Sequence, residues 1–403
     1  MTSFVGSKTG RIRQWGRASV ATPWRRSVWR GGVAYLVSRV MVVAGAGIVA
    51  AQRGVGDSVA GMPRPSTATR YIADVLTNWD GKWYLEIVRN GYPTHIPPNI
   101  TYEQTEARAA FFPGYPLTVR AADWILPGGD VFASLAVNVV LGALAVYLVG
   151  MLARDLFDAE IAGRAMVLFA MFPGSFVLSL AYSEALLLVL AAGALLALHR
   201  RHWWLAGVLS ALGTATRPNG VALVAACGVA AVLAIKDRRE WRSLVAPILA
   251  PLGFLGYQYY LYVHTDEDLA WFRVQREAWR EGTSFGATAV RGTLDFLTNP
   301  LESPTDLLTA ISVITMCALL WTTWKRRLPL PILAYIAVVL ALMLIPETVT
   351  ARPRFLYTAF PLLISAAAWW PTRDRDGWAA TMAMCGAGLV TLSGLYGVFG
   401  AIP

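Results

Sequence analysis

The chain has 403 residues, of which 56% are hydrophobic and only 15% charged, and its mean hydropathy is +0.48. A soluble domain carries about a quarter charged residues, so this composition excludes a soluble protein and indicates an integral membrane protein. The formal net charge of +10 does not indicate nucleic-acid binding, because the basic residues cluster beside apolar segments.

The N-terminal basic residues predict the orientation of the chain. Residues 1–31 contain seven Lys and Arg residues and no acid, and they directly precede an apolar run at residues 32–51. This is the positive-inside pattern, so we expect a basic cytoplasmic tail at residues 1–31. The run is too long for the core of a cleaved signal peptide, so we expect it to be the first span.

About eleven apolar blocks of spanning or near-spanning length follow one another along residues 32–403. The blocks between residues 165 and 235 are short, which predicts tilted, broken or re-entrant helices. Two long polar segments, at about residues 52–130 and 264–306, keep many aromatic residues. We therefore predict an all-α integral membrane protein: one polytopic helical bundle with two structured loops.

The charges of the connecting segments differ between the two sides of the membrane. When the predicted spans are threaded alternately, the side of the tail holds 20 Lys and Arg residues against 7 acids. The opposite side holds 14 Lys and Arg residues against 18 acids. This asymmetry predicts that both long loops are extracytoplasmic.

The segment at residues 78–92, in the first outer loop, combines one acid with several aromatic side chains. Asn78 is a favourable N-cap, which predicts a helix with Asp80 in its first turn, where the helix dipole favours an ionised carboxylate. Trp79 and Trp83 are four residues apart and predict an aromatic face suited to the headgroup layer. From these residues alone, an interfacial anchor and a functional carboxylate are equally good interpretations.

Other polar motifs lie at the outer ends of predicted spans. A proline-rich turn contains Tyr115 and either precedes a span or walls a sugar or lipid site; the first interpretation is favoured. Pro173 and Gly174 predict a break within the membrane, with Ser175 satisfying the freed backbone. Glu184 begins a span, where it is either a functional acid or an ordinary carboxylate at a helix N-terminus.

Arginines gather on the same predicted side. Arg217, Arg352 and Arg354 lie at outer ends of spans, where they can bind a lipid phosphate or extend to bulk headgroups. Arg39 lies about 10 Å inside the first span at 1.5 Å per residue. We expect it to pair with an acid or a bound phosphate.

The second long loop predicts another helix at the membrane interface. Trp271, Gln275 and Trp279 share one helical face, and Arg273 lies with two further arginines on another. The aromatic face is expected to enter the membrane, and the basic face to meet solvent and headgroups.

The cysteines and histidines do not form a metal-binding pattern. Cys227, Cys317 and Cys385 lie far apart inside apolar blocks, which predicts buried small side chains rather than disulfides or ligands. The four histidines show no metal-binding spacing. No metal site is predicted, and the use of a divalent metal is left open.

Together these segments resemble the PIG-V family of membrane mannosyltransferases (GPI mannosyltransferase 2-like), within the GT-C superfamily. The residues that carry the resemblance occur in the order of the family: Trp79-Asp80 with Gly91-Tyr92, Phe111-Phe-Pro-Gly-Tyr-Pro116, Ser183-Glu184, Arg217-Pro-Asn-Gly220, Gln275 with Trp279, and Arg354 before Phe360-Pro361. They cover about 280 residues, and only the ordered set is specific. The stretch around Gln275 departs from the family, being poorer in aromatic and Asn residues.

The resemblance implies a GT-C fold and transfer of mannose from polyprenyl-phosphate mannose to a glycolipid or lipid-linked glycan outside the cytoplasm, with no required cofactor. It also implies that Asp80 is the catalytic acid. The residues expected to bind substrate are Trp79, Lys82, Trp83, Tyr115, Glu184, Arg217, Asn219, Gln275, Trp279, Arg352 and Arg354.

Several alternatives remain at this stage. The Ala-, Arg- and Val-rich composition suggests a bacterial plasma-membrane protein, in which the acceptor differs from that of eukaryotic relatives. The enzyme could instead use another polyprenyl-phosphate sugar or a protein acceptor. A lipid flippase is less favoured, because the predicted polar groups lie on one side rather than along a path across the membrane. A structural scaffold would leave the outer acid and arginines without a role.

Overall fold

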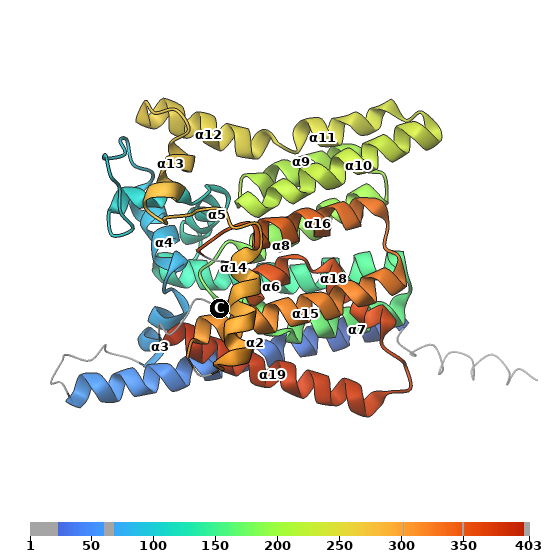
Figure 1. Cartoon of the computed structure of the whole chain (residues 1–403), viewed down its shortest axis with the longest axis horizontal. Coiled ribbons are helices and arrows are strands. Elements are labelled where there is room, and N and C mark those ends of the chain that lie inside the picture. Colours follow the sequence, from blue (N-terminus) through green and yellow to red (C-terminus); the bar gives the residue numbers. More distant parts are fainter. Residues whose placement is uncertain (1–22, 60–67, 301, 349, 399–403) are drawn as a thin grey trace, which may run out of the picture.

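The computed structural model describes residues 23–59, 68–300, 302–348 and 350–398, which fold almost entirely into helices (Figure 1). Within these ranges, the only isolated extended pairing is an antiparallel bridge between Thr283 and Pro346. Of the tail predicted at residues 1–31, residues 1–22 lie outside the described residues, and residues 23–31 belong to the first described helix, which begins at Pro23.

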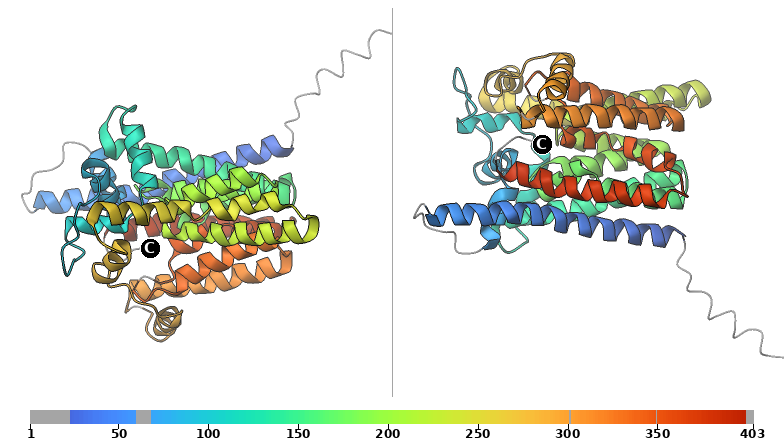
Figure 2. Two further views of the ribbon diagram at one scale, coloured as in Figure 1. Left: turned by 90° about the horizontal axis from the view of Figure 1, so that it is seen from above. Right: turned by 60° about the horizontal axis from the view of Figure 1, so that its bottom comes forward.

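The bundle is built from long and short apolar helices that run in roughly the same direction or its reverse (Figures 1 and 2). The long ones are α2 (Pro23–Val59), α6 (Gly129–Leu156), α10 (Val221–Arg238), α15 (Pro304–Arg326) and α19 (Arg375–Gly397). The shorter ones are α7 (Ala159–Met171), α8 (Glu184–His199), α9 (Trp203–Thr214), α11 (Val245–Leu249), α12 (Leu252–Thr265), α16 (Leu330–Leu344) and α18 (Pro361–Trp369).

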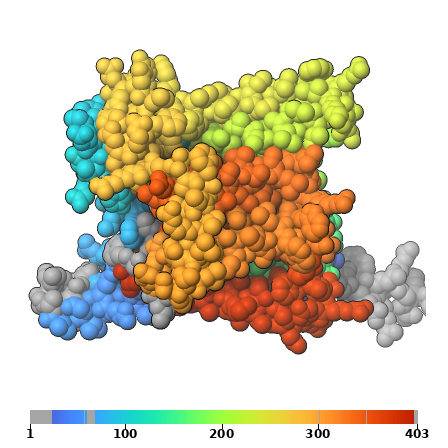
Figure 3. Space-filling model, in the orientation of Figure 1, coloured from blue at the N-terminus to red at the C-terminus, as the bar shows by residue number. Residues whose placement is uncertain are grey.

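The segments predicted as loops also contain helices, most of which gather at one end of the bundle (Figure 2). They are α3 (Ala68–Leu76), α4 (Asp80–Asn90), η1 (Thr105–Ala110), α5 (Gly114–Asp123), α13 (Ala270–Glu277) and α14 (Ala287–Thr298). Helix α14 packs against α15 along one face of the molecule (Figure 3). The remaining short elements are η2 (Pro173–Ser179), η3 (Pro218–Gly220), η4 (Trp241–Leu244) and α17 (Pro353–Thr358).

The expected count of about eleven spans is not confirmed. In the described residues, six helical segments are long and apolar enough to cross a membrane, or seven if α7 and η2 form one broken span. Three further apolar helices, α8, α9 and α16, have 16, 12 and 15 residues. At 1.5 Å per residue, even 16 residues are shorter than the hydrocarbon core of about 30 Å. The apolar block predicted at residues 355–370 is divided between α17 and α18.

The break predicted at Pro173 is confirmed, because α7 and η2 meet there at a bend of 72°. The hydroxyl of Ser175 donates to the carbonyl oxygen of Ala170 at 2.7 Å and so satisfies backbone freed by the break. A side chain at Gly174 would place Cβ 2.4 Å from the carbonyl oxygen of Pro353. Glycine at this position therefore allows η2 and α17 to pack closely.

Arg39 does not pair with an acid in the described part of the chain. Its Nη1 donates to the carbonyl oxygen of Ser175 at 2.8 Å and to Oγ of Ser179 at 2.9 Å. Its Nε donates to Oγ of Ser38. The expectation of an acidic partner is therefore wrong for the described residues, and a bound phosphate stays a prediction. The bend exposes carbonyl and hydroxyl oxygens inside the bundle, and these oxygens accept from the buried guanidinium.

Helix α13 packs its aromatic face against the first loop, so the prediction that this face enters the membrane is wrong. Trp271 donates its indole N–H to the carbonyl oxygen of Ala110 at 3.0 Å, and Val274 is fully buried. Arg273 forms ion pairs with Glu267 and Glu277. The aromatic face of α13 is therefore covered by the first loop rather than by lipid.

The prediction of three buried cysteines holds for two of them. Cys227 and Cys385 are buried, Cys317 on α15 is exposed, and all three are free thiols. The surface of a membrane bundle is itself apolar, so an apolar block does not reveal which of its side chains face inward.

Candidate active site

Asp80 is the first residue of α4, but Asn78 does not cap this helix. Trp79 occupies the cap position with φ of 56°, and no side chain accepts from the first turn. The carbonyl oxygen of Asn78 instead accepts from the hydroxyl of Tyr396. The backbone N–H of Asp80 donates to the hydroxyl of Tyr182 at 3.2 Å. The expected position of Asp80 in the first turn of α4 is confirmed. Hydrogen bonds to Tyr182 and Tyr396, which are distant in the sequence, hold the backbone at the start of this helix.

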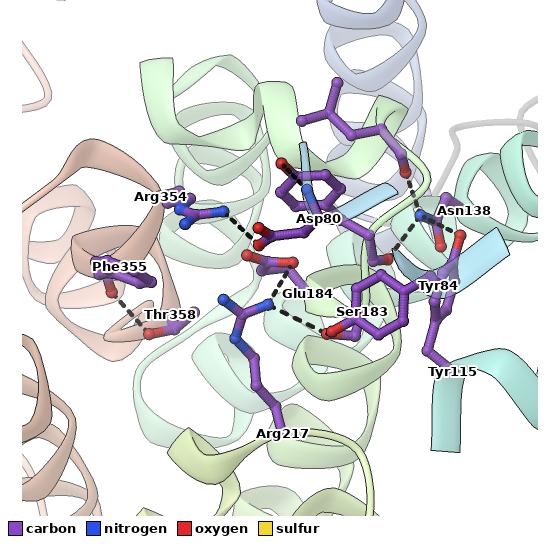
Figure 4. Close-up of polar contacts among 12 residues, drawn as sticks. Asp80, Tyr84, Tyr115, Asn138, Ser183, Glu184, Arg217, Arg354, Phe355 and Thr358 are labelled. Carbon is purple, nitrogen blue, oxygen red and sulfur yellow. Dashed lines mark hydrogen bonds and ion pairs between the residues drawn. The ribbon is translucent and has the colours of Figure 1, made fainter. Parts of the chain in front are cut away.

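Asp80 forms an ion pair with Arg354, from the short helix α17 (Figure 4). Nη1 of Arg354 donates to Oδ2 of Asp80 at 2.9 Å, and the two side chains are 6% and 16% exposed. The guanidinium also lies over the rings of Phe355, at 4.7 Å, and Tyr182, at 5.6 Å. Burial lowers the pKa of Arg354, but the charge of Asp80 outweighs it and the net shift is upward, so the guanidinium stays protonated.

A second buried ion pair joins Glu184, the first residue of α8, to Arg217, which directly precedes η3. Nη1 of Arg217 lies 2.9 Å from Oε2 of Glu184, whose side chain is 1% exposed. The contact lacks hydrogen-bond geometry, so neither carboxylate oxygen accepts a hydrogen bond from the described residues. Burial lowers the pKa of Arg217, but Glu184 outweighs this effect and the net shift is upward.

Ser183 and Tyr84 connect α4 to the second pair (Figure 4). The hydroxyls of Tyr84 and Ser183 lie 2.6 Å apart, and Nη1 of Arg217 donates to Oγ of Ser183 at 3.2 Å. Burial raises the pKa of Tyr84, so its hydroxyl remains protonated. Two acids and two arginines from α4, α8, the α9–η3 turn and α17 are therefore held in one hydrogen-bonded region.

Asn138, in the middle of α6, fixes the irregular segment that leads into α8. Its amide nitrogen donates to the carbonyl oxygens of Leu180 and Tyr182, the latter at 2.8 Å, and to the hydroxyl of Tyr115 at 3.2 Å. We did not predict a role for Asn138, Tyr84, Tyr182 or Ser183 as site residues. A lone Asn within an apolar span is the signal that could have revealed Asn138.

A groove of about 510 Å³ lies beside the start of α4. It is lined by three of the predicted substrate-binding residues together with residues of the first loop: Trp79, Lys82, Trp83, Glu86, Tyr102, Glu103 and Thr105. Trp279 packs beside it, with its ring centroid 5.3 Å from Tyr102 and 6.1 Å from Trp83. The second loop therefore contributes an aromatic side chain to the wall of this groove.

Four other predicted binding residues form no hydrogen bond or ion pair with Asp80, Arg354, Glu184 or Arg217 within the described ranges. Arg352 points to α15, where its Nη1 donates to Oγ1 of Thr309 at 2.6 Å. Tyr115 is fully buried and packs on Tyr84 as a core residue. Asn219 and Gln275 are partly buried. Nothing in the described residues assigns these four a substrate contact, so their role stays a prediction.

Within the described ranges, no group of three or more His, Cys, Asp or Glu side chains is placed to hold a metal ion. The acids at this end are instead paired with arginines. The charges available to a ligand here are therefore guanidinium groups and carboxylates.

The arrangement of the helices in this bundle is similar to that of solved membrane-protein structures. The crystal structure of ArnT from Cupriavidus metallidurans bound to undecaprenyl phosphate is similar, with a TM-score of 0.54 and 16% identity, over 89% of this chain and 63% of that one. The apo structure of the same protein has a TM-score of 0.50 and 18% identity, over 75% and 57% of the two chains.

Residues 64–265 match the family described as mannosyltransferase (PIG-V), and the chain belongs to this family. It is 32% identical over 159 residues to GPI alpha-1,6-mannosyltransferase 2 of Cricetulus griseus. That alignment covers 37% of this chain and 30% of the relative, so the chain matches less than a third of the relative's length. Asp80, Glu184 and Arg217 lie inside the family match, and Arg354 lies beyond it.

Proposed function

We propose that this protein transfers mannose from polyprenyl-phosphate mannose to a glycolipid or lipid-linked glycan, with Asp80 as the general base that activates the acceptor hydroxyl. The observation that carries the proposal is the contact of 2.9 Å between Asp80 and Arg354 at the start of α4. This pair places a proton acceptor, Asp80, and a phosphate ligand, Arg354, beside an aromatic groove. The binding of undecaprenyl phosphate by the similar ArnT protein supports a polyprenyl phosphate as the carrier.

In the proposed reaction, Arg354 changes partner when the donor binds. Its Nε has no hydrogen-bond partner among the described residues, so the guanidinium can donate a further hydrogen bond to a phosphate oxygen. As the phosphate takes up negative charge in the transition state, its attraction to Arg354 increases. Asp80 is then less strongly neutralised and is a better acceptor for a proton.

The chemical step is a displacement at the anomeric carbon. The acceptor hydroxyl oxygen forms a bond to C1 of mannose, while the bond from C1 to the phosphate oxygen breaks with its electron pair. Polyprenyl phosphate leaves, and the hydroxyl proton passes to Asp80. Arg217, held by Glu184, supplies a second positive charge to the departing phosphate. The expected outcome is inversion at C1.

We also place this end of the bundle outside the cytoplasm of a bacterial cell. The predicted excess of Lys and Arg on the opposite end supports this orientation. A single cysteine in place of Glu103, beside the groove, in a background without the native cysteines, tests it. A membrane-impermeant maleimide should label this position in intact cells, whereas labelling only after lysis would reverse the orientation.

Reconstitution of the purified protein in liposomes tests the activity. With radiolabelled polyprenyl-phosphate mannose and a lipid extract as acceptor, wild type should form a labelled glycolipid and Asp80→Asn should not. Equal transfer by both proteins would show that Asp80 is not the catalytic base. A strain that lacks this protein should accumulate the natural acceptor, which is the product without its last mannose, in its lipid extract.

The alternative donors are separated by competition. If arabinose or glucose on the same carrier is transferred and mannose is not, the enzyme uses another polyprenyl-phosphate sugar. If the label appears in protein rather than in lipid, the acceptor assignment is wrong while the transferase assignment stands.

A further inference from the structure

A second polar pocket lies at the end of the bundle away from Asp80. It occupies about 710 Å³ between the α8–α9 turn and η4. Its lining consists of Arg201, His202, Trp203, Trp204, Leu205, Glu240, Arg242 and Val245. Helix α9 has 12 residues between this pocket and the turn that holds Arg217, which at 1.5 Å per residue is about 18 Å. The pocket is therefore separate from the candidate active site.

The pocket is lined by more positively charged side chains than negatively charged ones. Oε1 of its only lining acid, Glu240, accepts from the indole N–H of Trp203 at 2.7 Å, and Oε2 lies 3.7 Å from Nη1 of Arg201. Arg242 is exposed and has no ion pair or hydrogen bond within the described ranges. His202, also exposed, adds an imidazole N–H donor.

The backbone supports a specific role for Arg201. Its φ of 61° lies in the left-handed region, where a glycine or asparagine is less strained than an arginine. This residue closes the turn between α8 and α9 and directs a guanidinium into the pocket. This conformation ends α8, because it allows the backbone N–H of His202 to donate to the carbonyl oxygen of Ala197 at 2.8 Å.

Apolar and aromatic side chains surround the charged lining. Trp204 is 68% exposed and Trp241 is 65% exposed, and tryptophan is typical of the depth at which a bilayer meets water. Beyond them, Leu205 and Ile248 expose 52% and 64% of their surfaces on α9 and α11. A ligand with a phosphate and hydrocarbon chains fits this arrangement better than a free anion, which would leave the apolar rim unused.

We propose that this pocket binds an anionic phospholipid from the leaflet opposite the active site. Its phosphate lies between Arg201, His202 and Arg242, and its acyl chains follow the exposed apolar surfaces of α9 and α11. This site does not depend on the sugar donor, the acceptor or the role of Asp80.

Native mass spectrometry of the full chain tests the proposal, with phosphatidylglycerol and phosphatidylcholine of identical acyl chains as probes. Wild type should retain phosphatidylglycerol preferentially. The double variant Arg201→Gln, Arg242→Gln should lose most of this preference, by roughly five- to tenfold for each arginine. Glu240→Gln removes a negative charge but keeps the acceptor for Trp203, so it should retain more phosphatidylglycerol than wild type.

The matched control is Lys325→Gln, Arg326→Gln, at the C-terminal end of α15 and outside the pocket. It removes the same charge and should bind phosphatidylglycerol as wild type does. An equal loss in both double variants would mean non-specific attraction and would overturn the proposal. Complete displacement of the lipid by millimolar inorganic phosphate, at constant ionic strength, would identify a free-anion site and also overturn it. Melting temperatures verify that each variant is folded.

Discussion

Asp80 and Arg354 are 274 positions apart in the chain, yet Oδ2 of the first lies 2.9 Å from Nη1 of the second. The contact closes one end of the bundle, because it joins the first loop to the short helix α17. It also places a carboxylate and a guanidinium side by side where both remain slightly exposed. This pair is the basis of the first prediction.

Asp80→Asn should reduce mannosyl transfer by about 10²–10⁴-fold, the usual contribution of a general base. The amide keeps the shape of the side chain and an oxygen for Arg354, so the protein should still fold. Initial rates in proteoliposomes at saturating donor measure the effect. Asp74→Asn, on an exposed acid of α3 at the same end, is the control and should keep wild-type rates. If Asp80→Asn is as active as this control, Asp80 has no role in the chemical step.

Glu184→Ala should destabilise the protein strongly, because it leaves Arg217 buried without its counter-charge. Removing one partner of a buried ion pair costs about 3–5 kcal/mol, so the melting temperature in detergent should fall clearly. Glu184→Gln keeps the volume of the side chain and should lose less stability than Glu184→Ala. A double variant, Glu184→Gln with Arg217→Met, should recover part of the stability but none of the transfer activity. Equal melting temperatures for Glu184→Ala and wild type would contradict a structural role for the pair.

The sequence predicts individual members of the site better than their partners. Asp80, Glu184, Arg217 and Arg354 all stand at helix ends, where a polar residue beside an apolar block is easily recognised. That Asp80 pairs with Arg354, and Glu184 with Arg217, depends on how helices from distant parts of the chain pack. No local pattern encodes this pairing.

The fold class was predicted from the sequence and the number of spans was not. Apolar composition identifies helices that avoid water, but it does not distinguish a lipid-facing span from a short helix buried between others. Helix α8 is almost wholly buried, which explains an apolar block with only 16 residues. Helix α13 shows the converse, because its Trp271 covers the first loop where the periodicity suggested lipid.

Gly253 should not tolerate a side chain. A Cβ there would lie 1.9 Å from the carbonyl oxygen of Ala211 and 2.6 Å from the backbone nitrogen of Ala215, so α12 would have to move away from α9. Gly253→Ala should therefore lower both the yield of folded protein and its melting temperature. Gly256→Ala, on the same helix with open space around it, is the control and should be neutral or slightly stabilising. Similar behaviour of the two variants would mean that α12 and α9 are not so closely packed.

Tyr84 should contribute to the loss of stability in alkali. Burial raises the pKa of its hydroxyl, so above about pH 10, the ordinary tyrosine value, the folded protein keeps a proton that the unfolded chain has lost. The free energy of unfolding therefore falls as the pH rises through this range. Tyr84→Phe should make the fall shallower, by at most about 1.4 kcal/mol per pH unit.

Melting temperatures between neutral and strongly alkaline pH provide the measurement for Tyr84. At neutral pH, Tyr84→Phe should be less stable than wild type by about 1 kcal/mol, because the hydrogen bond to Ser183 is lost. Ser183→Ala removes the same bond but keeps the tyrosine, so it should retain the wild-type alkaline slope. If the slope of Tyr84→Phe equals that of Ser183→Ala, Tyr84 does not titrate as expected.

Asn138→Leu should impair transfer through the position of Glu184 rather than through direct contact with substrate. The carbonyl oxygens of Leu180 and Tyr182 would lose their buried donor, at a cost of about 1–3 kcal/mol, and the segment before α8 would no longer be fixed. Asn138→Asp should be worse, because a carboxylate would face the same oxygens. Val140→Leu, on the exposed side of α6, is the control. Because Asn138 does not line the groove beside α4, kcat should fall more than KM rises, and a change confined to KM would argue instead for a binding role.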